Sequence, residues 1–367
     1  MTDLLFSPLN VGGMRLPHRV VMAPMTRARS TQPGDVPNRM MAEYYGQRAT
    51  AALIVSEATQ ISRQGQGYSF TPGIYSDDQV AGWRLVTDAV HAAGGRIFLQ
   101  LWHVGIMSHS TFHADGKPVA PSALSSDATV WIADEVTGAG GMVPCTVPRA
   151  LHTDEIPGIV DDYRRATANA MAAGFDGVEI HGANGYLIDE FLRRSSNRRA
   201  DRYGGSRENR MRFLFEVTEA VSAEAGAGRV GIRLSPLITQ RNMKDDEIIP
   251  VTLEVARHLH KVGLAYIHLS EADGPDVPNV PEAFRRELKA AFPGPIIAAG
   301  YFTRERAEKT LGTGLVDVIA FGRPFIGNPD LPRRLREGLP LADHNRERLF
   351  GGGPDGYSDY PDWSAAA

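Results

Sequence analysis

Short aliphatic runs alternate with longer segments whose apolar residues recur at helical spacing, and this alternation extends over almost the whole chain. It is typical of βα units, in which each buried strand of a parallel sheet is followed by a covering helix. Eight runs are predicted to be strands, at residues 20–25, 53–58, 96–102, 177–181, 230–234, 266–270, 295–299 and 316–321. Because eight parallel strands close a (β/α)8 barrel, we predict an α/β fold of the TIM-barrel type.

The alternative with the same alternation is a doubly wound open sheet. That fold usually places a glycine fingerprint directly after its first strand, whereas this strand runs into Ala-Pro-Met-Thr at residues 23–26. The closed barrel is therefore favoured. Its helices are clearest at residues 77–91, which start at an Asp pair and end before Gly94 and Gly95, and at residues 154–173.

Three segments lie outside the βα pattern, within what we expect to be one domain over residues 1–367. Residues 4–19 contain Val-Gly-Gly-Met, a hairpin signal, and are predicted to cap the closed end of the barrel. Residues 104–150 form a long insertion after the third strand, and residues 193–206 are rich in Arg and Gly. Both follow strand ends, where lids and pocket walls are expected.

Composition narrows the possible partners and compartment. The 367 residues carry a formal net charge of −4 with acids and bases interspersed, which argues against nucleic acid and membrane surfaces as partners. The single cysteine excludes an intramolecular disulfide and any metal site made only of cysteines, so a cytoplasmic protein is expected. The amino terminus lacks a signal-peptide pattern, and no run is long enough to span a membrane.

Polar side chains gather where the fourth predicted strand gives way to a helix. His181 ends this strand, and Asn184 and Tyr186 follow it, so that the three lie within six residues. The carboxyl ends of barrel strands carry the chemistry of TIM-barrel enzymes, so these three residues suggest a set that faces a substrate. His181 alone would more often be a buried structural histidine. Together, His181 and Asn184 can donate hydrogen bonds to one acceptor, and Tyr186 adds an acid of high pKa.

The last two strands supply a candidate phosphate site. Gly300 ends the seventh strand, and Gly322 with Arg323 ends the eighth. Loops at these two positions often bind phosphate through backbone amides, and an arginine can donate two hydrogen bonds to its oxygens. The competing interpretation is that both glycines are turn residues and Arg323 is an ordinary surface arginine.

Arg233 lies within the fifth predicted strand, where a charge without a partner would be costly to bury. Either an anionic ligand faces it, or it forms an internal ion pair with Glu57 or Glu271. Thr26, Gln100 and Trp102 are further polar residues near strand ends.

The remaining polar clusters carry weaker signals. The histidines at 103, 109 and 113 are loosely spaced like metal ligands, but no carboxylate or cysteine completes a zinc pattern, so we expect no metal. The arginine pairs at 193–194 and 198–199 are expected to be a solvated face or a loop anchor. Cys145 lies in the long loop and is expected to be inert.

Several motifs, taken together, resemble the Old Yellow Enzyme family of FMN-dependent ene-reductases, and most closely its bacterial members that reduce pentaerythritol tetranitrate, N-ethylmaleimide or morphinone. The resemblance extends from Leu5 to about Trp363. The motifs that carry it are residues 22–27, 42–45, 100–103, 181–187, 197–210, 320–323 and 351–357.

This resemblance implies a role for each candidate. FMN would lie across the mouth of the barrel, with NAD(P)H as its hydride donor. Arg233 would face N1 and O2 of the flavin, Gln100 its pyrimidine edge and Thr26 its O4. The implied cofactor-binding residues are Pro24, Met25, Thr26, Ala58, Gln100, Arg233, Gly300, Tyr301, Gly322 and Arg323. The implied substrate-binding residues are Tyr68, Trp102, His181, Asn184, Tyr186 and Phe350.

The implied reaction is ping-pong. NAD(P)H would reduce the flavin and leave, and an activated alkene would then take hydride from flavin N5 at its β-carbon. His181 and Asn184 would bind the carbonyl or nitro oxygen, and Tyr186 would protonate the α-carbon from the opposite face. Reduction of nitro compounds or nitrate esters could accompany this activity. The resemblance leaves a monomer and a homodimer equally open.

Two positions depart from the family pattern. Ile106 follows Gly105 where relatives commonly have an arginine, and Phe350 stands where relatives often have a tyrosine. The loop after the third strand is therefore expected to present a more apolar wall. Two other functions were weighed: a lyase or aldolase that binds a substrate phosphate, which would typically need a lysine in a strand, and a barrel that only stores flavin. The predicted strands contain no lysine.

Overall fold

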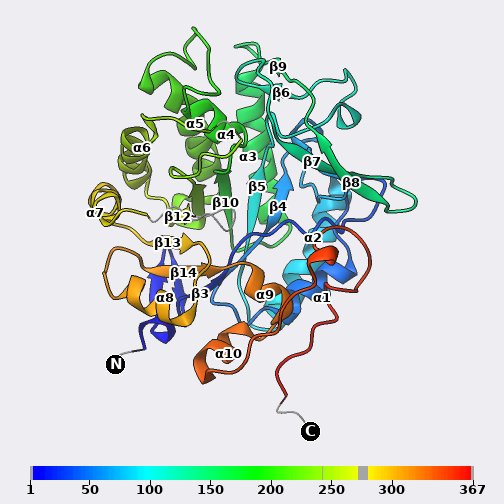
Figure 1. Cartoon of the computed structure of the whole chain (residues 1–367), viewed down its shortest axis with the longest axis vertical. Coiled ribbons are helices and arrows are strands. Elements are labelled where there is room, and N and C mark those ends of the chain that lie inside the picture. The colour runs from blue at the N-terminus through cyan, green and yellow to red at the C-terminus, as the bar shows by residue number, and fades with distance from the viewer. Residues whose placement is uncertain (1–2, 242, 272–279, 365–367) are drawn as a thin grey trace.

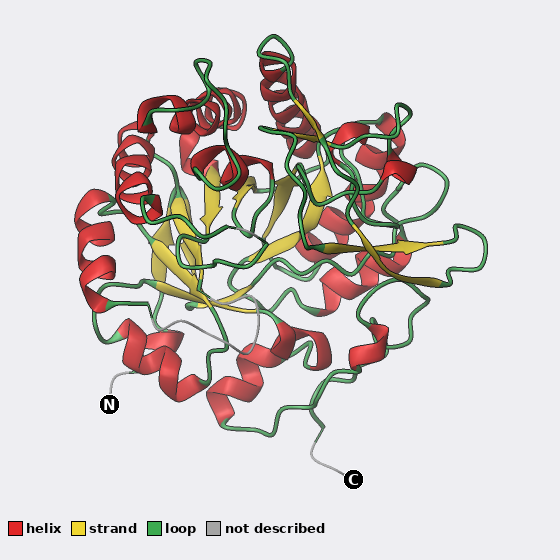
Figure 2. Ribbon diagram, turned by 45° about the horizontal axis from the view of Figure 1, so that its top comes forward, coloured by secondary structure: helices red, strands yellow, loops and turns green. Residues whose placement is uncertain are grey.

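The computed structural model describes residues 3–241, 243–271 and 280–364. Within these residues, eight parallel strands close into a barrel, and helices surround it on the outside (Figures 1 and 2). In order around the barrel the strands are β3 (Val20–Met22), β4 (Ile54–Gln60), β5 (Ile97–Trp102), β10 (Gly177–Gly182), β11 (Val230–Leu234), β12 (Tyr266–Ser270), β13 (Ile296–Ala299) and β14 (Val318–Phe321). The predicted TIM barrel and its strands are confirmed.

The strand boundaries differ most at the first strand, which ends at Met22 and not at residue 25. After Ala23, the backbone turns away from the sheet, and the amides of Arg27 and Ala28 donate to Glu57 Oε2 at 3.0 and 2.9 Å. The Glu57 carboxylate, and not a neighbouring strand, therefore accepts the backbone amides that follow the first strand.

Helices follow most of the barrel strands. The α-helices are α1 (Arg39–Gln47), α2 (Asp77–Ala92), α3 (Ile156–Ala172), α4 (Leu187–Leu192), α5 (Arg207–Ala225), α6 (Ile248–Val262), α7 (Glu282–Ala291), α8 (Arg304–Leu311), α9 (Arg323–Gly327) and α10 (Leu331–Glu337). Short 3-10 turns lie at Leu4–Phe6, Arg63–Gly65, Ser110–Phe112, Ala227–Arg229 and Arg346–Arg348. Helix α2 starts as the sequence predicted, because Ser76 and Gln79 form a capping box at its first turn.

The predicted amino-terminal hairpin consists of β1 (Leu9–Val11) and β2 (Met14–Leu16). Val11 and Leu16 are fully buried and pack into the apolar cluster that fills the lower barrel. Gly12, at the turn, has a φ of +55°, and a Cβ there would lie 2.1 Å from the carbonyl oxygen of Gly228, just before β11. The hairpin therefore covers the amino ends of the strands, opposite the candidate site.

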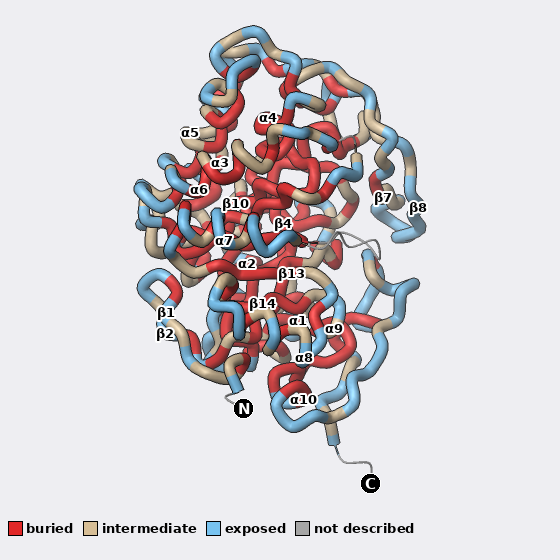
Figure 3. The backbone as a smooth tube through the Cα atoms, turned by 60° about the vertical axis from the view of Figure 1, so that its left-hand side comes forward, coloured by how far each residue is buried: buried red, intermediate tan, exposed pale blue. Residues whose placement is uncertain are grey.

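The insertion after β5 carries the short parallel pair β6 (Val119–Ala120) and β9 (Arg149–Ala150), and the antiparallel hairpin β7 (Thr129–Ala133) and β8 (Gly140–Pro144). Figure 1 shows β7 and β8 at the side of the barrel. The barrel strands themselves are buried, and exposure is confined mainly to outer loops and helix faces (Figure 3).

The second loop, after α4, is anchored by one of its arginines. Arg193 is fully buried, forms an ion pair with Asp189 at 2.7 Å and donates to the carbonyl of Ser235 at 2.8 Å. Its neighbour Arg194 and the more distant Arg198 are exposed. Arg193 is therefore a loop anchor, as one interpretation of the arginine pairs predicted, whereas Arg194 and Arg198 belong to a solvated face, as the other predicted.

Arg27 joins the end of the first strand to the carboxyl-terminal segment. Its buried guanidinium donates to the carbonyls of Leu349 at 3.0 Å and Gly356 at 2.8 Å and to the Tyr44 hydroxyl at 3.1 Å. The Tyr44 ring stacks on Tyr357 with centroids 4.0 Å apart. Three motifs that are distant in sequence thus meet in one cluster. Among the described residues, no helix is long and apolar enough to cross a membrane.

Candidate active site

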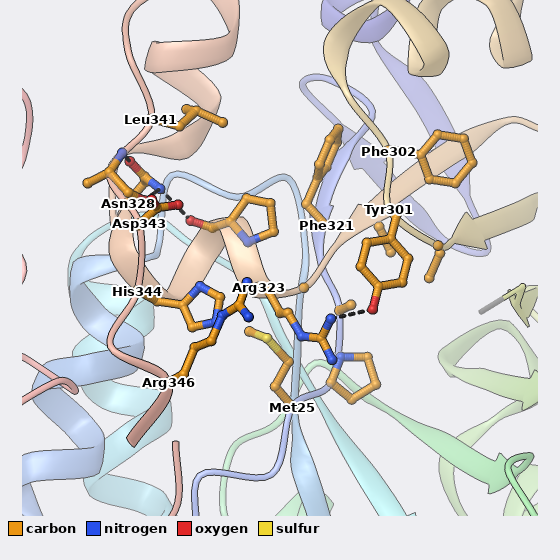
Figure 4. Close-up of a pocket in the computed structure, with 18 of the residues that line it drawn as sticks. Met25, Tyr301, Phe302, Phe321, Arg323, Asn328, Leu341, Asp343, His344 and Arg346 are labelled. Carbon is orange, nitrogen blue, oxygen red and sulfur yellow. Dashed lines mark hydrogen bonds between the residues drawn. The ribbon is translucent and has the colours of Figure 1, made fainter. Parts of the chain in front are cut away.

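A cavity of about 460 Å³ opens at the carboxyl ends of β3, β11, β13 and β14 (Figure 4). Seven of the residues predicted to hold the cofactor line it: Pro24, Met25, Arg233, Gly300, Tyr301, Gly322 and Arg323. The strand ends therefore bring the two halves of the predicted site, the phosphate end and the Arg233 end, into one space.

Arg323 and Tyr301 form the exposed end of this cavity. The Arg323 guanidinium donates to the Tyr301 hydroxyl and lies 5.2 Å from the ring centroid (Figure 4). Tyr301 has a φ of +48°, which a non-glycine residue rarely adopts, so the chain after β13 is held in a tight turn at the cavity. An arginine beside two strand-end glycines is suited to bind a phosphate group.

The sequence analysis missed the far wall of this cavity, which comes from the segment after α10. Asp343, His344 and Arg346 line the cavity near Arg323 (Figure 4). Burial and the charges of Arg323 and Arg346 lower the pKa of His344. This segment is a loop that follows no barrel strand, so strand-end reasoning gave no signal for it.

Arg233 lies in β11, in register with His181 of β10 on one side and His268 of β12 on the other. The two carboxylates considered as its partners have contacts of their own. Glu57 accepts the amides of Arg27 and Ala28, and Glu271 lies 2.6 Å from the Arg285 guanidinium. Arg233 lines the cavity and so brings a positive charge to its inner end.

Gln100, Thr26 and Ala58, which were also predicted to contact the cofactor, are not among the residues that line the cavity. Gln100 is buried in β5, in register with Ala58 of β4 and Glu179 of β10. Its amide nitrogen donates to Glu179 Oε1 at 2.7 Å. Their roles toward a cofactor stay predictions.

Glu179 is the centre of a buried polar network inside the barrel that the sequence analysis did not single out. Its Oε2 accepts from the Tyr266 hydroxyl at 3.0 Å and lies 2.9 Å from His268 Nδ1. Burial acts to raise the pKa of Glu179, but the charges of His268 and Arg233 and the hydrogen bonds of the network outweigh it and lower this pKa. Glu179 is therefore ionised, and it fixes the amide of Gln100 below the cavity.

His181, Asn184 and Tyr186 come together as predicted, with two further aromatic residues. The rings of His181 and Tyr186 are edge to face, with centroids 4.9 Å apart, and Trp102 meets Tyr186 in the same way at 4.9 Å. The Tyr68 ring stacks on Trp102 at 5.5 Å, and its hydroxyl lies 3.4 Å from that of Tyr186. Four of the six residues expected to bind a substrate thus form one aromatic cluster with two hydroxyl groups: Tyr68, Trp102, His181 and Tyr186.

Three polar atoms of this cluster are buried without a hydrogen-bond partner among the described residues: His181 Nδ1, Asn184 Oδ1 and Trp102 Nε1. Buried polar groups are normally paired, so such a concentration points to a bound molecule. Burial, followed by the charges of Arg233 and Arg241, lowers the pKa of His181 well below its usual value. His181 is therefore neutral at pH 7 and retains one ring N–H to donate.

The backbone around Asn184 is held in an unusual conformation. Asn184 has a φ of +60°, its amide donates to Ser235 Oγ at 2.7 Å, and its carbonyl accepts from Arg241 at 2.7 Å. The amide of Gly185 donates to Asp189 Oδ2 at 2.9 Å. These contacts fix the turn that carries Asn184 and Tyr186 from the end of β10 into α4, as expected where local strain is used to aim side chains.

The outer wall of the site contains Ile106 and Phe350, the two positions at which the sequence departs from the family pattern. Ile106 and Met107 are buried in one apolar cluster with Trp102 and Tyr186, so the wall is apolar as expected. Phe350 stacks on Trp131 of β7 with centroids 6.3 Å apart. Phe350 is 44% exposed, and its predicted contact with a substrate stays a prediction. Burial raises the pKa of Cys145 to about 11, in line with an inert thiol.

Residues 4–342 match the model of the NADH:flavin oxidoreductase / NADH oxidase family. The chain is 45% identical over 370 residues to putative 12-oxophytodienoate reductase 11 from Oryza sativa subsp. japonica, with 98% of both proteins covered. The structure of morphinone reductase in complex with tetrahydroNAD is 49% identical, with a TM-score of 0.94 over 98% of each chain. The old yellow enzyme homologue from Zymomonas mobilis is 44% identical, with a TM-score of 0.91 over 97% of this chain and 99% of that one.

These likenesses extend over the whole barrel and its insertion, and they agree with the resemblance inferred from the motifs. The lyase and the simple flavin store considered above have no comparable support. The chain belongs to the Old Yellow Enzyme family, and it is an FMN-dependent oxidoreductase of the NADH:flavin oxidoreductase type.

Proposed function

We propose that this protein is an ene-reductase, which uses NAD(P)H to reduce the C=C bond of α,β-unsaturated carbonyl or nitro compounds. The observation that carries the proposal is the buried ring nitrogen Nδ1 of His181, which has no partner among the described residues and belongs to a ring that lies edge to face with Tyr186. The side-chain amide of Asn184, three residues further on, supplies a second potential N–H donor. Two potential N–H donors next to a phenol suit a substrate that needs one oxygen bound and one carbon protonated.

The cavity is suited to FMN. Arg323 and the strand-end glycines at 300 and 322 would hold its phosphate, and Pro24 and Met25 would contact the ring system. Arg233 would hold positive charge beside the part of the ring that becomes negative on reduction. Bound FMN supplies a two-electron redox centre that accepts a hydride from a nicotinamide and donates one to a second substrate.

His181 and Asn184 would bind the oxygen of the electron-poor alkene. That oxygen gains negative charge as the β-carbon accepts hydride, so donors that are already in place stabilise the transition state more than the ground state. The neutral state of His181 preserves this function because it keeps a ring N–H without a fixed charge. Trp102 and Ile106 would exclude water from the reacting carbons.

Tyr186 would hold the proton for the α-carbon. Its hydroxyl lies 3.4 Å from that of Tyr68, and burial raises the pKa of Tyr68 well above its usual value. Tyr68 therefore stays protonated and can stabilise the Tyr186 oxygen after its proton has been transferred. Proton transfer by a positioned acid of this kind typically contributes about 10²- to 10⁴-fold to a rate.

The relatives support both substrates. Morphinone reductase has been solved with tetrahydroNAD bound, which supports a nicotinamide donor for this chain. Relatives named 12-oxophytodienoate reductases support an enone as the acceptor. Nitro compounds and nitrate esters are further candidate acceptors, which the apolar wall at Ile106 is expected to discriminate.

An anaerobic absorbance experiment tests this function. The purified protein should be yellow, should lose its flavin absorbance on addition of NADPH or NADH, and should regain it on addition of 2-cyclohexenone. A protein that is bleached by the nicotinamide but not reoxidised by any enone would contradict the ene-reductase proposal. A colourless protein that takes up no FMN would contradict the cofactor site as well.

A further inference from the structure

A second cavity, of about 420 Å³, adjoins the cluster that contains Tyr186, because Ile106 and Arg241 line it and also lie next to Tyr186. Its walls come from the insertion after β5, from the loop after α4 and from the segment after β11. The two long loops of the sequence thus face each other across it. It is lined by Ile106, Ala120, Ser122, Leu124, Ser125, Ser126, Glu190, Ser195, Ser196, Arg198, Arg241, Met243 and Lys244.

The lining carries an excess of positive charge. Arg198, Arg241 and Lys244 contribute three cations, and Glu190 is the one acid among these residues. Neither Arg198 nor Lys244 has an ion-pair partner in the described part of the chain. Asp245, the next residue after Lys244, accepts the backbone amides of Arg194 and Glu247. Arg198 and Lys244 therefore bring to the cavity two positive charges that no acidic side chain of the described residues pairs with.

Glu190 does not cancel this charge. It is 1% exposed, its Oε1 accepts the amide of Ile106 at 2.8 Å, and its Oε2 has no partner among the described residues. Burial, reinforced by the charge of Asp189, raises its pKa well above the usual value and so favours the protonated, neutral form. Oε2 is then a potential hydrogen-bond donor, and Ser195 Oγ is also buried without a partner in the same wall.

Arg241 connects this cavity to the reacting residues. It donates to the Asn184 carbonyl at 2.7 Å, and its guanidinium lies 5.8 Å from the centroid of the Tyr186 ring. Ile106 lines the cavity and also packs in the cluster that contains Tyr186. A molecule whose reactive end lies at His181 and Tyr186 can therefore extend toward the three cations.

We propose that the second cavity binds an oxyanion, phosphate or carboxylate, carried by a reactant whose other end is at the His181–Asn184–Tyr186 cluster. Paired cations, serine hydroxyls and a protonated carboxyl are the donors that such a group needs. The oxyanion has two sources in a ping-pong reductase: the phosphates of the nicotinamide donor, or an acidic chain on the enone. This inference rests on the proposed function, because it assigns the reactants of that same site.

The test uses the holoenzyme and a double variant, Arg198→Gln with Lys244→Gln, in which both exposed cations of the cavity are neutralised. The control is Arg15→Gln with Lys309→Gln, which removes two exposed cations elsewhere on the surface. Anaerobic stopped-flow absorbance gives the dissociation constant of each donor and acceptor in its own half-reaction. The donors are NADPH, NADH and the phosphate-free 1-benzyl-1,4-dihydronicotinamide. The acceptors are a cyclopentenone with a carboxyalkyl chain and its methyl ester.

We expect the double variant to bind one class of charged reactant about tenfold more weakly, and the neutral reactants unchanged. If only NADPH and NADH bind more weakly, the phosphates of the nicotinamide donor are the group that the cavity binds. If the carboxylate acceptor binds more weakly and its methyl ester does not, the acidic chain of the enone is the group that the cavity binds. Equal dissociation constants for all reactants in the variant and the control would overturn the inference, as would equal weakening of charged and neutral ones.

The donor measurements are independent of alkene reduction. If no enone reoxidises the flavin, the proposed function fails. The dissociation constants for NADPH and the phosphate-free donor would still show whether the cavity binds phosphate.

Discussion

The hydroxyl oxygens of Tyr68 and Tyr186 lie 3.4 Å apart, although the two residues are separated by 118 positions in the chain. Tyr186 ends the turn after β10, whereas Tyr68 lies in the loop after β4 and is held there by stacking on Trp102. This contact gives the proposed proton donor a hydroxyl partner within the cluster. We therefore expect Tyr68 to act as a positioning residue that sets the direction of the Tyr186 hydroxyl.

Replacement of Tyr68 by Phe should slow reoxidation of the flavin by 2-cyclohexenone about tenfold, because one neutral hydrogen bond to Tyr186 is lost. Its ring would still stack on Trp102, so the binding constant for the enone should change little. Stopped-flow reoxidation over a range of enone concentrations separates the two quantities. A change in the binding constant with an unchanged limiting rate would show that Tyr68 serves only to bind the substrate.

Buried neutral histidines should make the protein sensitive to acid. Burial lowers the pKa of His103 from 6.5 to about 3. Below pH 6.5 His103 is protonated in the unfolded chain but stays neutral in the folded protein. The free energy of unfolding therefore decreases as the pH is lowered. Between pH 7 and pH 5 this residue should cost roughly 2 kcal/mol of unfolding free energy.

His103→Gln should therefore lose less Tm than the wild type when the pH is lowered from 7 to 5. His260→Gln, at an exposed position, is the matched control and should follow the wild type. An identical pH dependence of Tm in the His103 variant and the wild type would show that His103 is not the group responsible.

The cap at the bottom of the barrel depends on one glycine of its turn. Gly12→Ala should destabilise the protein by about 1–3 kcal/mol, because it combines a positive φ with a Cβ only 2.1 Å from the Gly228 carbonyl oxygen. The adjacent Gly13→Ala should be nearly neutral, since a Cβ there meets nothing within 4 Å. Chemical denaturation of both variants checks this difference, and equal losses would mean that the turn does not pack as described.

Arg27→Ala should destabilise the protein by about 1–3 kcal/mol, since it removes the Arg27 donor of the buried Gly356 carbonyl hydrogen bond. It also removes one of the two arginine donors to the carbonyls of Leu349 and Arg348, which keep their hydrogen bonds to Arg29. The carboxyl-terminal segment should also become more sensitive to proteases. Limited proteolysis with mass spectrometry locates the first cuts. Cuts that begin elsewhere, with residues 349–357 still protected, would contradict the anchoring role of Arg27.

The barrel could be predicted from sequence because its strands are short apolar runs between helices of clear periodicity. The end of β3 could not, because the Glu57 side chain accepts the backbone amides that follow it, a contact between positions 30 residues apart. Such non-local hydrogen bonds leave no trace in local hydrophobic patterning.

Part of the candidate site could likewise be predicted from the sequence, and part of it could not. His181, Asn184, Tyr186, Gly322 and Arg323 stand directly at strand ends, so the barrel geometry alone placed them on one face. Tyr68 and Phe350 entered only through the family resemblance. Glu179 was hidden within an apolar strand, and His344 and the serines of the second cavity lie in loops whose path depends on tertiary packing.

The most direct test of the account compares the two half-reactions in the Tyr186→Phe variant by anaerobic stopped-flow. Flavin reduction by NADPH should be nearly unchanged, and reoxidation by 2-cyclohexenone should be slower by about 10² or more, because only the second step needs a proton at carbon. Equal losses in both half-reactions, or none in the second, would contradict the assignment of Tyr186 as the proton donor of an ene-reductase.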